Sequence, residues 1–441
     1  MIKVITYGTY DLMHEGHIRL LLRAKALGDY LIVGVTAEDF DRKRGKINVQ
    51  QTLMQRIEAV RQTGLADEII VEEYEGQKID DIKKYNIDIF TVGSDWKGHF
   101  DYLKEFCEVI YLPRTEGISS TDLRSEKRSL KIGIYGDADY IEKFVRESKY
   151  VDGVEIIGIY KGSLCRATKE KNSLCISEQK ISEEANAIYL IGVPDNHYLI
   201  IKKFLQMGKH VLCEAPICLN EDETVELYQF AAQKGLVLME AIKTAYATAY
   251  ARLCLLAKSG IIGRILSVDA ICTSLQGGGY KPKNWNALCA WGPTALLPVF
   301  QLLGTEFKEI RFVTWTKDKD HWSDEFTKID FVFDKAVASI KVGVGVKSEG
   351  ELIISGTKGY IYVPAPWWKT DYFEIRYEDT NKNRRYFYQL EGEGIRNEIL
   401  AFTRAIASGD KIGGVSEEIS GTISKVVHMF KVEENVVHIS N

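Results

Sequence analysis

The 441-residue chain lacks several features that mark special classes of protein. None of its apolar runs is long enough to cross a bilayer. Its first residues, Met1 to Gly8, have neither the basic nor the apolar region of a signal peptide. Its eight cysteines are scattered, without CxxC pairs or zinc-ligand spacing. We therefore expect a cytoplasmic protein with reduced thiols and no membrane insertion.

The chain also has no excess of positive charge. Lysine and arginine total 57 against 62 aspartate and glutamate, a formal net charge of -5. This balance gives no reason to expect nucleic acid or an anionic membrane as a partner. With 27% charged and 45% hydrophobic residues, the composition is that of a globular protein whose length suggests two or three domains.

The most informative stretch is Gly8-Thr-Tyr-Asp-Leu-Met-His-Glu-Gly-His17. It follows an apolar run, Ile2–Thr6, and precedes a helical pattern, Ile18–Leu27, which predicts a strand, a tight glycine turn and a helix. We expect His14 and His17 in the first turn of that helix, on one face. Because a helix N-terminus attracts anions, the stretch predicts a phosphate site. A lone histidine here would more often be structural.

Residues 1–127 alternate short apolar runs with helical patterns. This βαβ alternation predicts an α/β fold with a parallel, Rossmann-like doubly wound sheet, whose ligands bind at the carboxyl ends of the strands. The expected strands are Lys3–Thr6, Tyr30–Thr36, Glu68–Glu72, Ile87–Gly93 and Glu108–Leu112. The expected helices lie around Ile18–Leu27, Gln51–Thr63, Ile79–Tyr85 and Asp101–Phe106.

Two later stretches should reach the same edge of this sheet. Asp41-Arg-Lys-Arg-Gly-Lys46 is a cationic loop directly after the second strand. Such a charge run is usually a solvated face, although its place after a strand favours a ligand-binding role. Arg114-Thr-Glu-Gly-Ile-Ser-Ser-Thr121, followed by Arg124, begins after the last strand. Its hydroxyl groups could simply cap a helix, but three in a row between arginines suit a polyphosphate.

With these motifs in view, the chain resembles a known family. His14-Glu-Gly-His17 is the HxGH signature of the nucleotidyltransferase superfamily, and its combination with Arg114-Thr-Glu-Gly-Ile-Ser119 is similar to glycerol-3-phosphate cytidylyltransferases. Gly93-Ser-Asp-Trp96, Gln77-Lys78 and Tyr111–Gly117 also resemble that family. The HxGH signature alone is shared with enzymes that make adenylylated products, whereas the second motif points to cytidine.

One position departs from the family pattern. The family tends to carry a basic residue before its aromatic–Val–Asp–Glu segment, whereas this chain has Gly64 ahead of Leu65-Ala-Asp-Glu68. Arg56 or Arg61 could supply the missing charge. That CTP contact therefore stays unassigned.

The resemblance implies a transferase that moves CMP from CTP to glycerol 3-phosphate or a related polyol phosphate, giving CDP-glycerol and pyrophosphate for teichoic acid or capsule polymers. The attacking phosphate oxygen is already ionised at pH 7, so the site must align the reactants and stabilise negative charge. The resemblance assigns catalysis to His14, His17 and Lys46, and the acceptor phosphate to Arg44 and Lys78. The implied CTP contacts are Gly8, Thr9, Tyr10, Gly16, Asp95, Arg114, Thr115, Glu116, Gly117, Ile118, Ser119, Ser120 and Thr121.

No dedicated carboxylate cage for a metal is visible, so we expect Mg²⁺ to arrive with CTP. The expected partners are CTP and a polyol phosphate, and the expected assembly is a homodimer.

A polar segment, Arg124-Ser-Glu-Lys-Arg-Ser129, then leads into a second βαβ series. We expect a cytidylyltransferase domain at 1–127, a second Rossmann domain at 130–245, and an α+β domain with a mostly antiparallel, open-faced sheet at 246–441. The Rossmann strands are expected at Leu130–Tyr135, Glu155–Tyr160, Ala187–Val193, His210–Cys213 and Val237–Glu240. The later strands are expected at Ile265–Ser274, Ile310–Thr316, Lys328–Phe333, Ala336–Val344, Gly350–Ser355 and Phe373–Tyr377, with closing helices at Arg396–Ser408 and Glu417–Glu433.

This second part resembles the Gfo/Idh/MocA oxidoreductases, through Pro194-Asp-Asn-His197, Gly208–Pro216 and Gly356-Thr-Lys-Gly359. The dinucleotide turn is degenerate, because it reads Gly136-Asp-Ala-Asp-Tyr-Ile141 in place of GxGxxG. The second strand ends in Gly158-Ile-Tyr-Lys161, without the acidic residue that would hold a ribose. The remnants of the dinucleotide site are Gly136, Pro194, His197 and Glu214.

The chemistry expected of that family is also incomplete. Ala215 stands in place of the family's proton-donating lysine, and Ala290-Trp-Gly-Pro-Thr294 lacks its usual Asp and His. His197 and Lys243 remain polar near the expected cleft, although His197 alone is more often structural. These losses argue against a dehydrogenase of the usual mechanism, and they leave open whether this part binds NAD(P).

Two alternatives for the second part stay open. It could be an oxidoreductase that reduces a keto-polyol phosphate whose product the first domain then activates. It could instead be a non-catalytic dimerisation, sensing or scaffold module.

Overall fold

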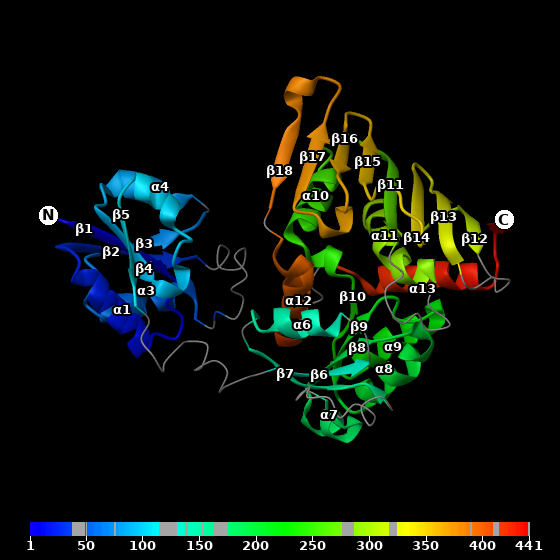
Figure 1. Ribbon diagram of the computed structural model, residues 1–441, viewed down its shortest axis with the longest axis horizontal. Coiled ribbons are helices and arrows are strands. Elements are labelled where there is room, and N and C mark those ends of the chain that lie inside the picture. The colour runs from blue at the N-terminus through cyan, green and yellow to red at the C-terminus, as the bar shows by residue number, and fades with distance from the viewer. Residues whose placement is uncertain are drawn as a thin grey trace. The chain divides into compact units, whose positions relative to one another are not determined.

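The computed structural model describes residues 1–441 except 38–48, 50, 75, 114–129, 137–139, 152, 163–174, 276–285, 317–323, 389, 409–413 and 440–441. The chain divides into two compact units, Met1–Ser129 and Leu130–Asn441 (Figure 1). The predicted site residues Arg44, Lys46 and 114–121 lie outside the described residues.

The N-terminal unit is built on a five-stranded parallel sheet in the order β3-β2-β1-β4-β5. Its strands are β1 (Lys3–Gly8), β2 (Tyr30–Thr36), β3 (Glu68–Glu72), β4 (Ile89–Gly93) and β5 (Glu108–Leu112). The helices are α1 (Glu15–Lys25), α3 (Leu53–Gln62) and α4 (Gln77–Tyr85), with 3₁₀ turns η1 (Ser94–Trp96) and η2 (Asp101–Glu105). The predicted parallel sheet is confirmed, although β4 starts at Ile89 and not at Ile87.

Both faces of this sheet are covered, because the central residues of its strands are mostly apolar on both sides. Leu21 and Ala24 of α1 and Val60 of α3 pack with Val4 and Leu31 into one buried cluster. A second cluster, on the other set of strand side chains, takes Ile82 from α4 and Leu103 from η2. The order of strands reverses direction between β1 and β4, and such a switch point is where doubly wound sheets bind ligands.

The C-terminal unit begins with a second five-stranded parallel sheet, in the order β10-β9-β8-β6-β7. Its strands are β6 (Leu130–Gly136), β7 (Val154–Tyr160), β8 (Ala187–Ile191), β9 (His210–Glu214) and β10 (Leu238–Ala241). The accompanying helices are α6 (Ile141–Ser148), α7 (Glu178–Glu184), α8 (His197–Gln206) and α9 (Glu221–Gln233). This arrangement confirms the second Rossmann-like sheet predicted from the sequence.

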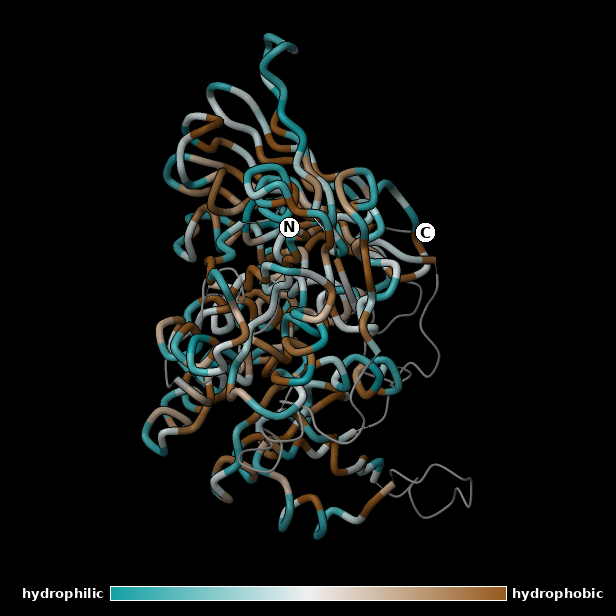
Figure 2. The backbone as a smooth tube through the Cα atoms, turned by 90° about the vertical axis from the view of Figure 1, so that its left-hand side faces the viewer, coloured by the Kyte–Doolittle hydropathy of each residue, from teal (hydrophilic) through white to brown (hydrophobic). Residues whose placement is uncertain are grey.

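A nine-stranded sheet follows, in the order β18-β17-β16-β15-β11-β14-β13-β12-β19. Its neighbours are antiparallel except for the parallel pairs β11–β14 and β12–β19, so the predicted mostly antiparallel sheet is confirmed. The strands are β11 (Ile265–Ser274), β12 (Glu309–Thr316), β13 (Asp324–Val332), β14 (Val337–Val344), β15 (Leu352–Gly356), β16 (Tyr360–Val363), β17 (Tyr372–Arg376), β18 (Arg384–Phe387) and β19 (Val436–His438). The turn between β17 and β18 is hydrophilic and projects at the top of Figure 2.

Helices join the two sheets of this unit. The helices here are α10 (Thr248–Lys258), α11 (Ala287–Leu303), α12 (Ile395–Ser408) and α13 (Glu417–Lys431). Although it comes late in the chain, α12 packs Ile399 and Phe402 against Phe144 of α6, beside the Rossmann-like sheet (Figure 1). Helix α11 was not predicted from the sequence. It contains Pro293 and Pro298, and the Asn286 side chain caps its start.

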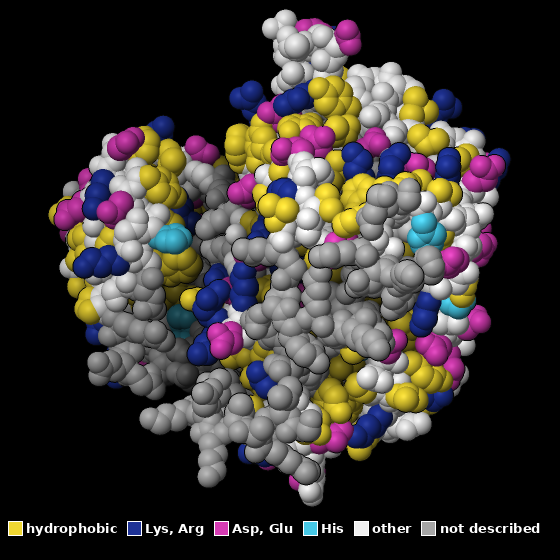
Figure 3. Space-filling view, turned by 45° about the vertical axis from the view of Figure 1, so that its right-hand side comes forward, with side chains coloured by type: hydrophobic (Ala, Val, Ile, Leu, Met, Phe, Trp, Pro, Cys, Tyr) yellow, Lys and Arg dark blue, Asp and Glu magenta, His cyan; other side chains and the backbone are white. Residues whose placement is uncertain are grey.

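The described helices include none that is both long enough and apolar enough to cross a membrane. On the face drawn in Figure 3, the described acidic and basic side chains are interspersed and do not form one basic stripe. This mixed surface agrees with the formal net charge of -5.

Candidate functional site

The loop after β1 places His14 at the start of α1. His14 is the N-cap of the helix, with φ -138° and ψ 171°, and its Nδ1 accepts a hydrogen bond of 3.0 Å from the Gly16 N–H. The prediction that His14 lies inside the first helical turn is therefore wrong. The first N–H groups of a helix have no hydrogen-bond partner within the helix, and the His14 side chain supplies one of them with an acceptor, as an N-cap residue does.

His17 lies in the first turn of α1 and its ring stacks on that of His14. The ring centroids are 3.9 Å apart with an interplanar angle of 25°. The two imidazoles therefore lie side by side, although His14 is the N-cap and His17 is a helical residue. Because His14 Nδ1 accepts a hydrogen bond, its neutral ring carries the proton on Nε2. The pair thus presents a nitrogen donor at a helix N-terminus, where the helix dipole also favours negative charge.

Tyr10 forms the support beneath this pair. Its side chain is buried, and its ring meets the His17 ring edge-on with centroids 5.6 Å apart. A Cβ atom at Gly8 would lie 2.9 Å from the Tyr10 ring, so the glycine is required by this contact within the protein. Tyr10 itself has φ +53°, a left-handed conformation that is uncommon for a bulky residue. The strained turn is held in place by the contacts that follow.

Residues at the start of α3 fasten the loop from the other side. Gln51 receives a hydrogen bond from the Leu12 N–H at 2.8 Å, and its own N–H donates to the Asp11 carboxylate at 3.0 Å. Asp11 is fully buried. The loop between β1 and α1 is therefore tied by both a side chain and a backbone group of Gln51.

Arg56 adds a clamp that reasoning from the sequence missed. Its Nη1 donates to the carbonyls of Thr9 and Thr36 at 2.8 Å each, and its Nε donates to the Gln51 carbonyl at 3.1 Å. The side chain is fully buried. One guanidinium thus joins the loop after β1 to the end of β2. The sequence offered only an unplaced charge here. Arg61, the other candidate, is mostly exposed and pairs with Glu58.

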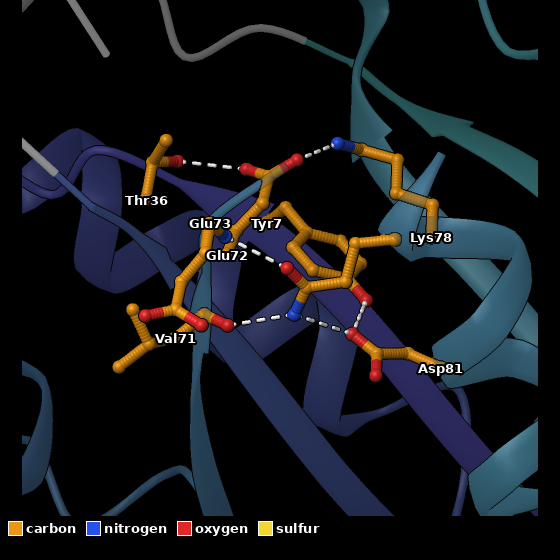
Figure 4. Close-up of polar contacts among 8 residues, drawn as sticks. Tyr7, Thr36, Val71, Glu72, Glu73, Lys78 and Asp81 are labelled. Atoms are coloured by element: carbon orange, nitrogen blue, oxygen red, sulfur yellow. Dashed lines mark hydrogen bonds and ion pairs between the residues drawn. The ribbon is translucent and has the colours of Figure 1, made fainter. Parts of the chain in front are cut away.

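The predicted phosphate ligand Lys78 lies in a buried network at the end of β3 (Figure 4). Its ammonium forms an ion pair with Glu72, whose other oxygen accepts a hydrogen bond of 2.9 Å from Thr36. It also lies 4.6 Å from the centroid of the Tyr7 ring. Lys78 is 7% exposed and Glu72 is 1% exposed, so this pair is held within the unit.

A second chain of contacts fixes the start of α4 (Figure 4). Gln77 donates to the Val71 carbonyl at 2.6 Å and to Asp81 at 3.0 Å, and Asp81 accepts the Tyr7 hydroxyl at 2.8 Å. Burial, together with the charge of Asp81, raises the pKa of Tyr7 far above its ordinary value. Tyr7 therefore stays a neutral donor. Through these bonds Gln77 sets the position of Lys78.

The ends of β4 and β5 complete the same edge of the sheet. Gly93, the last residue of β4, leads into η1, where the Trp96 ring lies 5.8 Å from that of Phe100. Asp95 belongs to η1, but its side chain is outside the described part of the chain. Arg23 of α1 donates to the Pro113 carbonyl at 2.6 Å, which holds the exit of β5 beside α1.

Within the described residues, no group of three or more His, Cys, Asp or Glu side chains is placed to hold a metal ion. The seven described cysteines are free thiols.

The remnants of a dinucleotide site in the C-terminal unit are largely buried. His197 is 1% exposed, its Nδ1 lies 3.1 Å from the Pro216 carbonyl, and burial lowers its pKa to about 4. It is thus a neutral ring that supports the loop after β9, in line with the structural interpretation. Pro194 is buried as well. At Gly136 a Cβ would lie 1.6 Å from the Ile191 carbonyl oxygen, so this glycine permits β6 and β8 to approach.

Stacked histidines at a helix start, after the first strand and at the switch point of a parallel sheet, define a nucleotidyltransferase of the cytidylyltransferase-like family. The profile of that family matches residues 5–126. The chain is 52% identical over 130 residues to the glycerol-3-phosphate cytidylyltransferase of Bacillus spizizenii, a match that covers 30% of this chain and 100% of that protein. For the Staphylococcus aureus enzyme of the same name the identity is 49% over 129 residues, covering 29% and 95%. Through its N-terminal unit the chain belongs to the glycerol-3-phosphate cytidylyltransferase family.

The C-terminal unit is similar to oxidoreductases. The profile described as an oxidoreductase family with an NAD-binding Rossmann fold matches residues 130–242. A 3-ketoreductase from Actinomadura kijaniata, in a crystal structure with TDP-benzene and NADP, superimposes with a TM-score of 0.61 and 18% identity. That match covers 71% of this chain and 100% of the ketoreductase. At this identity the likeness concerns the fold.

Proposed function

We propose that the N-terminal unit transfers CMP from CTP to glycerol 3-phosphate, giving CDP-glycerol and pyrophosphate. The observation that carries this proposal is the stacked His14–His17 pair at the N-terminus of α1. It lies in a segment that covers the full length of a glycerol-3-phosphate cytidylyltransferase at 52% identity. By analogy with that family, the product would supply a teichoic acid or capsule polymer.

In this reaction a phosphate oxygen of the acceptor attacks the α-phosphorus of CTP. The new P–O bond forms as the bond to the β-phosphate breaks, and pyrophosphate leaves with the electron pair. The acceptor phosphate is ionised at pH 7, so no side chain has to remove a proton. The protein must bring the two phosphates into line and stabilise the charge that spreads over the transferring group.

The described residues suit that task. His14 Nε2 serves as a donor toward an oxygen on the α-phosphorus, with His17 stacked beside it and the α1 N-terminus behind. Arg56 and Gln51 keep the loop rigid, which reduces the reorganisation needed when the charge develops.

We assign the remaining contacts as in the family. Lys46 would bind the triphosphate, 114–121 the nucleotide, and Arg44 and Lys78 the acceptor phosphate. For Lys78 this requires exchange of its Glu72 partner for the incoming phosphate. Because the described acidic and imidazole side chains form no metal cluster, we propose that Mg²⁺ enters bound to CTP.

The test is an acceptor panel. The full-length protein is incubated with CTP, Mg²⁺ and glycerol 3-phosphate, glycerol 2-phosphate or a longer polyol phosphate, and pyrophosphate release is followed alongside the mass of the CDP product. We expect CDP-glycerol from glycerol 3-phosphate, with loss of activity in His17→Ala. Activity that survives this substitution, or that prefers ATP to CTP, would refute the proposal.

A second candidate function is reduction of a keto-polyol phosphate by the C-terminal unit, with NAD(P) as cofactor. The match to the NAD-binding family profile favours it. The chain's own residues fit a dinucleotide poorly. Gly136 is followed by Asp-Ala-Asp, β7 ends at Tyr160 and leads into Lys161 without a carboxylate, and Ala215 replaces a lysine. We therefore derive no step through the cofactor.

Titration of the full-length protein with NADH and NADPH, read by nucleotide fluorescence, separates the alternatives. Binding of either nucleotide supports the oxidoreductase. Failure of both eliminates it and leaves a scaffold, sensing or dimerisation role. Light scattering of the same sample tests the proposed homodimer, and a monomer at micromolar concentration would contradict it.

A further inference from the structure

A polar cluster in the C-terminal unit lies where the parallel strands of its first sheet end. Glu214 is the last residue of β9 and is paired in register with Ala241, the last residue of β10. Lys243 follows β10 in the short turn η5 (Lys243–Tyr246), and its ammonium lies 4.9 Å from the ring centroid of Tyr140. The carboxyl ends of parallel strands and the junctions between subdomains are the common places for small-molecule sites.

Three lysines from separate elements converge here on one carboxylate. Lys143 comes from α6, Lys243 from η5 and Lys369 from η6 (Trp367–Lys369), and we call them the lysine trio. Their shared partner is Glu393, with Nζ–O distances of 3.5 Å for Lys243 and 2.9 Å for Lys369 and a shorter contact for Lys143. Burial lowers the pKa of Lys243, against the charge of Glu393, but Lys143 and Lys369 already outnumber this one carboxylate, so the trio keeps an excess of positive charge.

Glu393 occupies a constrained turn just before α12. Its φ is +55°, and it stands between Gly392 and Gly394, which have φ of +58° and +87°. Burial alone would raise the pKa of Glu393, but hydrogen bonds from Lys143 and Lys369 and the charge of Lys243 outweigh it and hold the pKa at about 2. Glu393 is thus a permanent anion held at the centre of the trio.

Two further carboxyl groups of the same unit interact electrostatically with Lys243. Glu214 accepts a hydrogen bond from the hydroxyl of Tyr189, and Glu398 of α12 is 2% exposed. We call Glu214 and Glu398 the acid pair. Glu398 Oε2 is buried and has no hydrogen-bond partner among the described side chains and backbone. A buried polar atom in that state costs free energy unless a ligand satisfies it.

Burial of the acid pair works against a negative charge on either carboxyl group. Burial raises the pKa of Glu398 well above its ordinary value, and the nearby Glu214 raises it further, while Lys243 acts in the opposite sense. Burial likewise raises the pKa of Glu214, against the hydrogen bond from Tyr189 and the charge of Lys243. A carboxyl group accepts hydrogen bonds when ionised and can also donate one when protonated, so either form can pair with hydroxyl groups of a ligand.

We propose that the lysine trio and the acid pair form a second substrate site, which binds a small polyol phosphate or its keto form. The trio takes the phosphate, in exchange for part of its pairing with Glu393. The acid pair hydrogen-bonds the hydroxyl or carbonyl groups of the carbon chain. The anionic character of the ligand follows from the charges at this site, whereas the choice of a glycerol-sized polyol rests on the proposed function of the N-terminal unit.

The experiment is a lysine footprint on the full-length protein, because it reports on this site alone. A limiting dose of an acetylating reagent is applied with no addition, with glycerol 3-phosphate, with dihydroxyacetone phosphate, with glycerol or with inorganic phosphate. Peptide mass spectrometry then gives the acetylation at each lysine of the trio and at Lys308, a control that pairs with Asp334 elsewhere in the unit.

We expect the two organic phosphates to lower acetylation of the trio by threefold or more, on the order of what partial occupancy of a site gives, with no change at Lys308. Glycerol, which lacks the anion, should not protect. Protection by inorganic phosphate equal to that by glycerol 3-phosphate overturns the polyol assignment, and no protection by any of them overturns the site.

Two variants sharpen the result. Glu393→Gln removes the internal competitor and should tighten binding of glycerol 3-phosphate about fivefold, on the scale of one partly exposed ion pair. Lys369→Met should abolish the protection of Lys143, and weaker binding in Glu393→Gln would overturn the proposed competition. Pyrophosphate release by the N-terminal unit should be unchanged in both. Its absence from every sample refutes the proposed transferase while leaving the footprint interpretable.

Discussion

The side chain of His14 performs two separable tasks, so two substitutions at this one position should have different effects. Its Nδ1 caps α1 by accepting the Gly16 N–H at 3.0 Å, and in the proposed reaction its Nε2 is the donor to the phosphate. Asparagine has an oxygen close to the backbone and is among the best N-cap residues, but it cannot reach where Nε2 reaches. Alanine can do neither.

The magnitudes follow from these two tasks. Replacing a good N-cap by alanine costs about 1 kcal/mol, or about 4 °C in the unfolding temperature of a unit of this size. Losing one preorganised donor to the transition state lowers kcat by about 100- to 1,000-fold. We therefore expect His14→Asn to keep wild-type stability with that loss of activity, and His14→Ala to lose both.

Hydrogen exchange of the full-length protein measures the cap locally, because peptides from Glu15–Lys25 report on α1 alone. Pyrophosphate release at saturating CTP measures the catalytic task. Faster exchange in His14→Ala but not in His14→Asn is the expected pattern. A missing donor should lower kcat about 100-fold or more. If His14→Asn kept more than about a tenth of the wild-type kcat, the donor role would therefore be wrong. If both variants opened α1 equally, the capping role would be wrong.

Three further predictions concern buried groups. In Arg56→Lys the new ammonium group cannot reach all three carbonyls that the guanidinium joins. The free energy of unfolding should fall by about 2 kcal/mol and kcat should also fall, and unchanged thermal unfolding would contradict the clamp. Lys78→Met leaves Glu72 buried without its ion partner, and should lower the free energy of unfolding measured by calorimetry by about 3–5 kcal/mol. The double variant with Glu72→Gln should recover most of this loss, and no recovery would count against the ion pair. Burial raises the pKa of Glu240 from 4.5 to about 7, so the native state favours the protonated form and stability is lost as pH rises through 7. Glu240→Gln should therefore increase the free energy of unfolding at pH 8 by up to about 3 kcal/mol, seen as a higher unfolding temperature, and should leave both unchanged below pH 4.5. An equal shift at both pH values would refute this.

The positions of the strands could be predicted because their cause is local. Tyr30–Thr36 and Glu68–Glu72 were expected with the same bounds that the structure shows, since apolar runs of strand length between turns and helices carry their own signal. Errors fall at ends and at unusual residues. The first helix was expected to begin by His14, whereas it begins at Glu15, because a cap and a first turn have similar sequences.

Side-chain partners were not predictable in the same way. Nothing near Arg56 indicates that it reaches Thr9 and Thr36, which are 47 and 20 residues away in the sequence. These contacts exist only because the end of β2, the loop after β1 and the start of α3 come together at one edge of the sheet. Reading the charge alone left Arg56 as an unplaced cation.

The sequence by itself therefore determined the two Rossmann-like sheets, the place of the histidine pair after the first strand, and membership of a cytidylyltransferase family. These depend on periodicity, turn residues and short motifs, each encoded within a few neighbouring residues. The tertiary structure alone decided that His14 is a cap, that Lys78 pairs with Glu72, and that Glu393 gathers its three lysines. Such contacts depend on how distant elements pack, and that register is set by the whole fold.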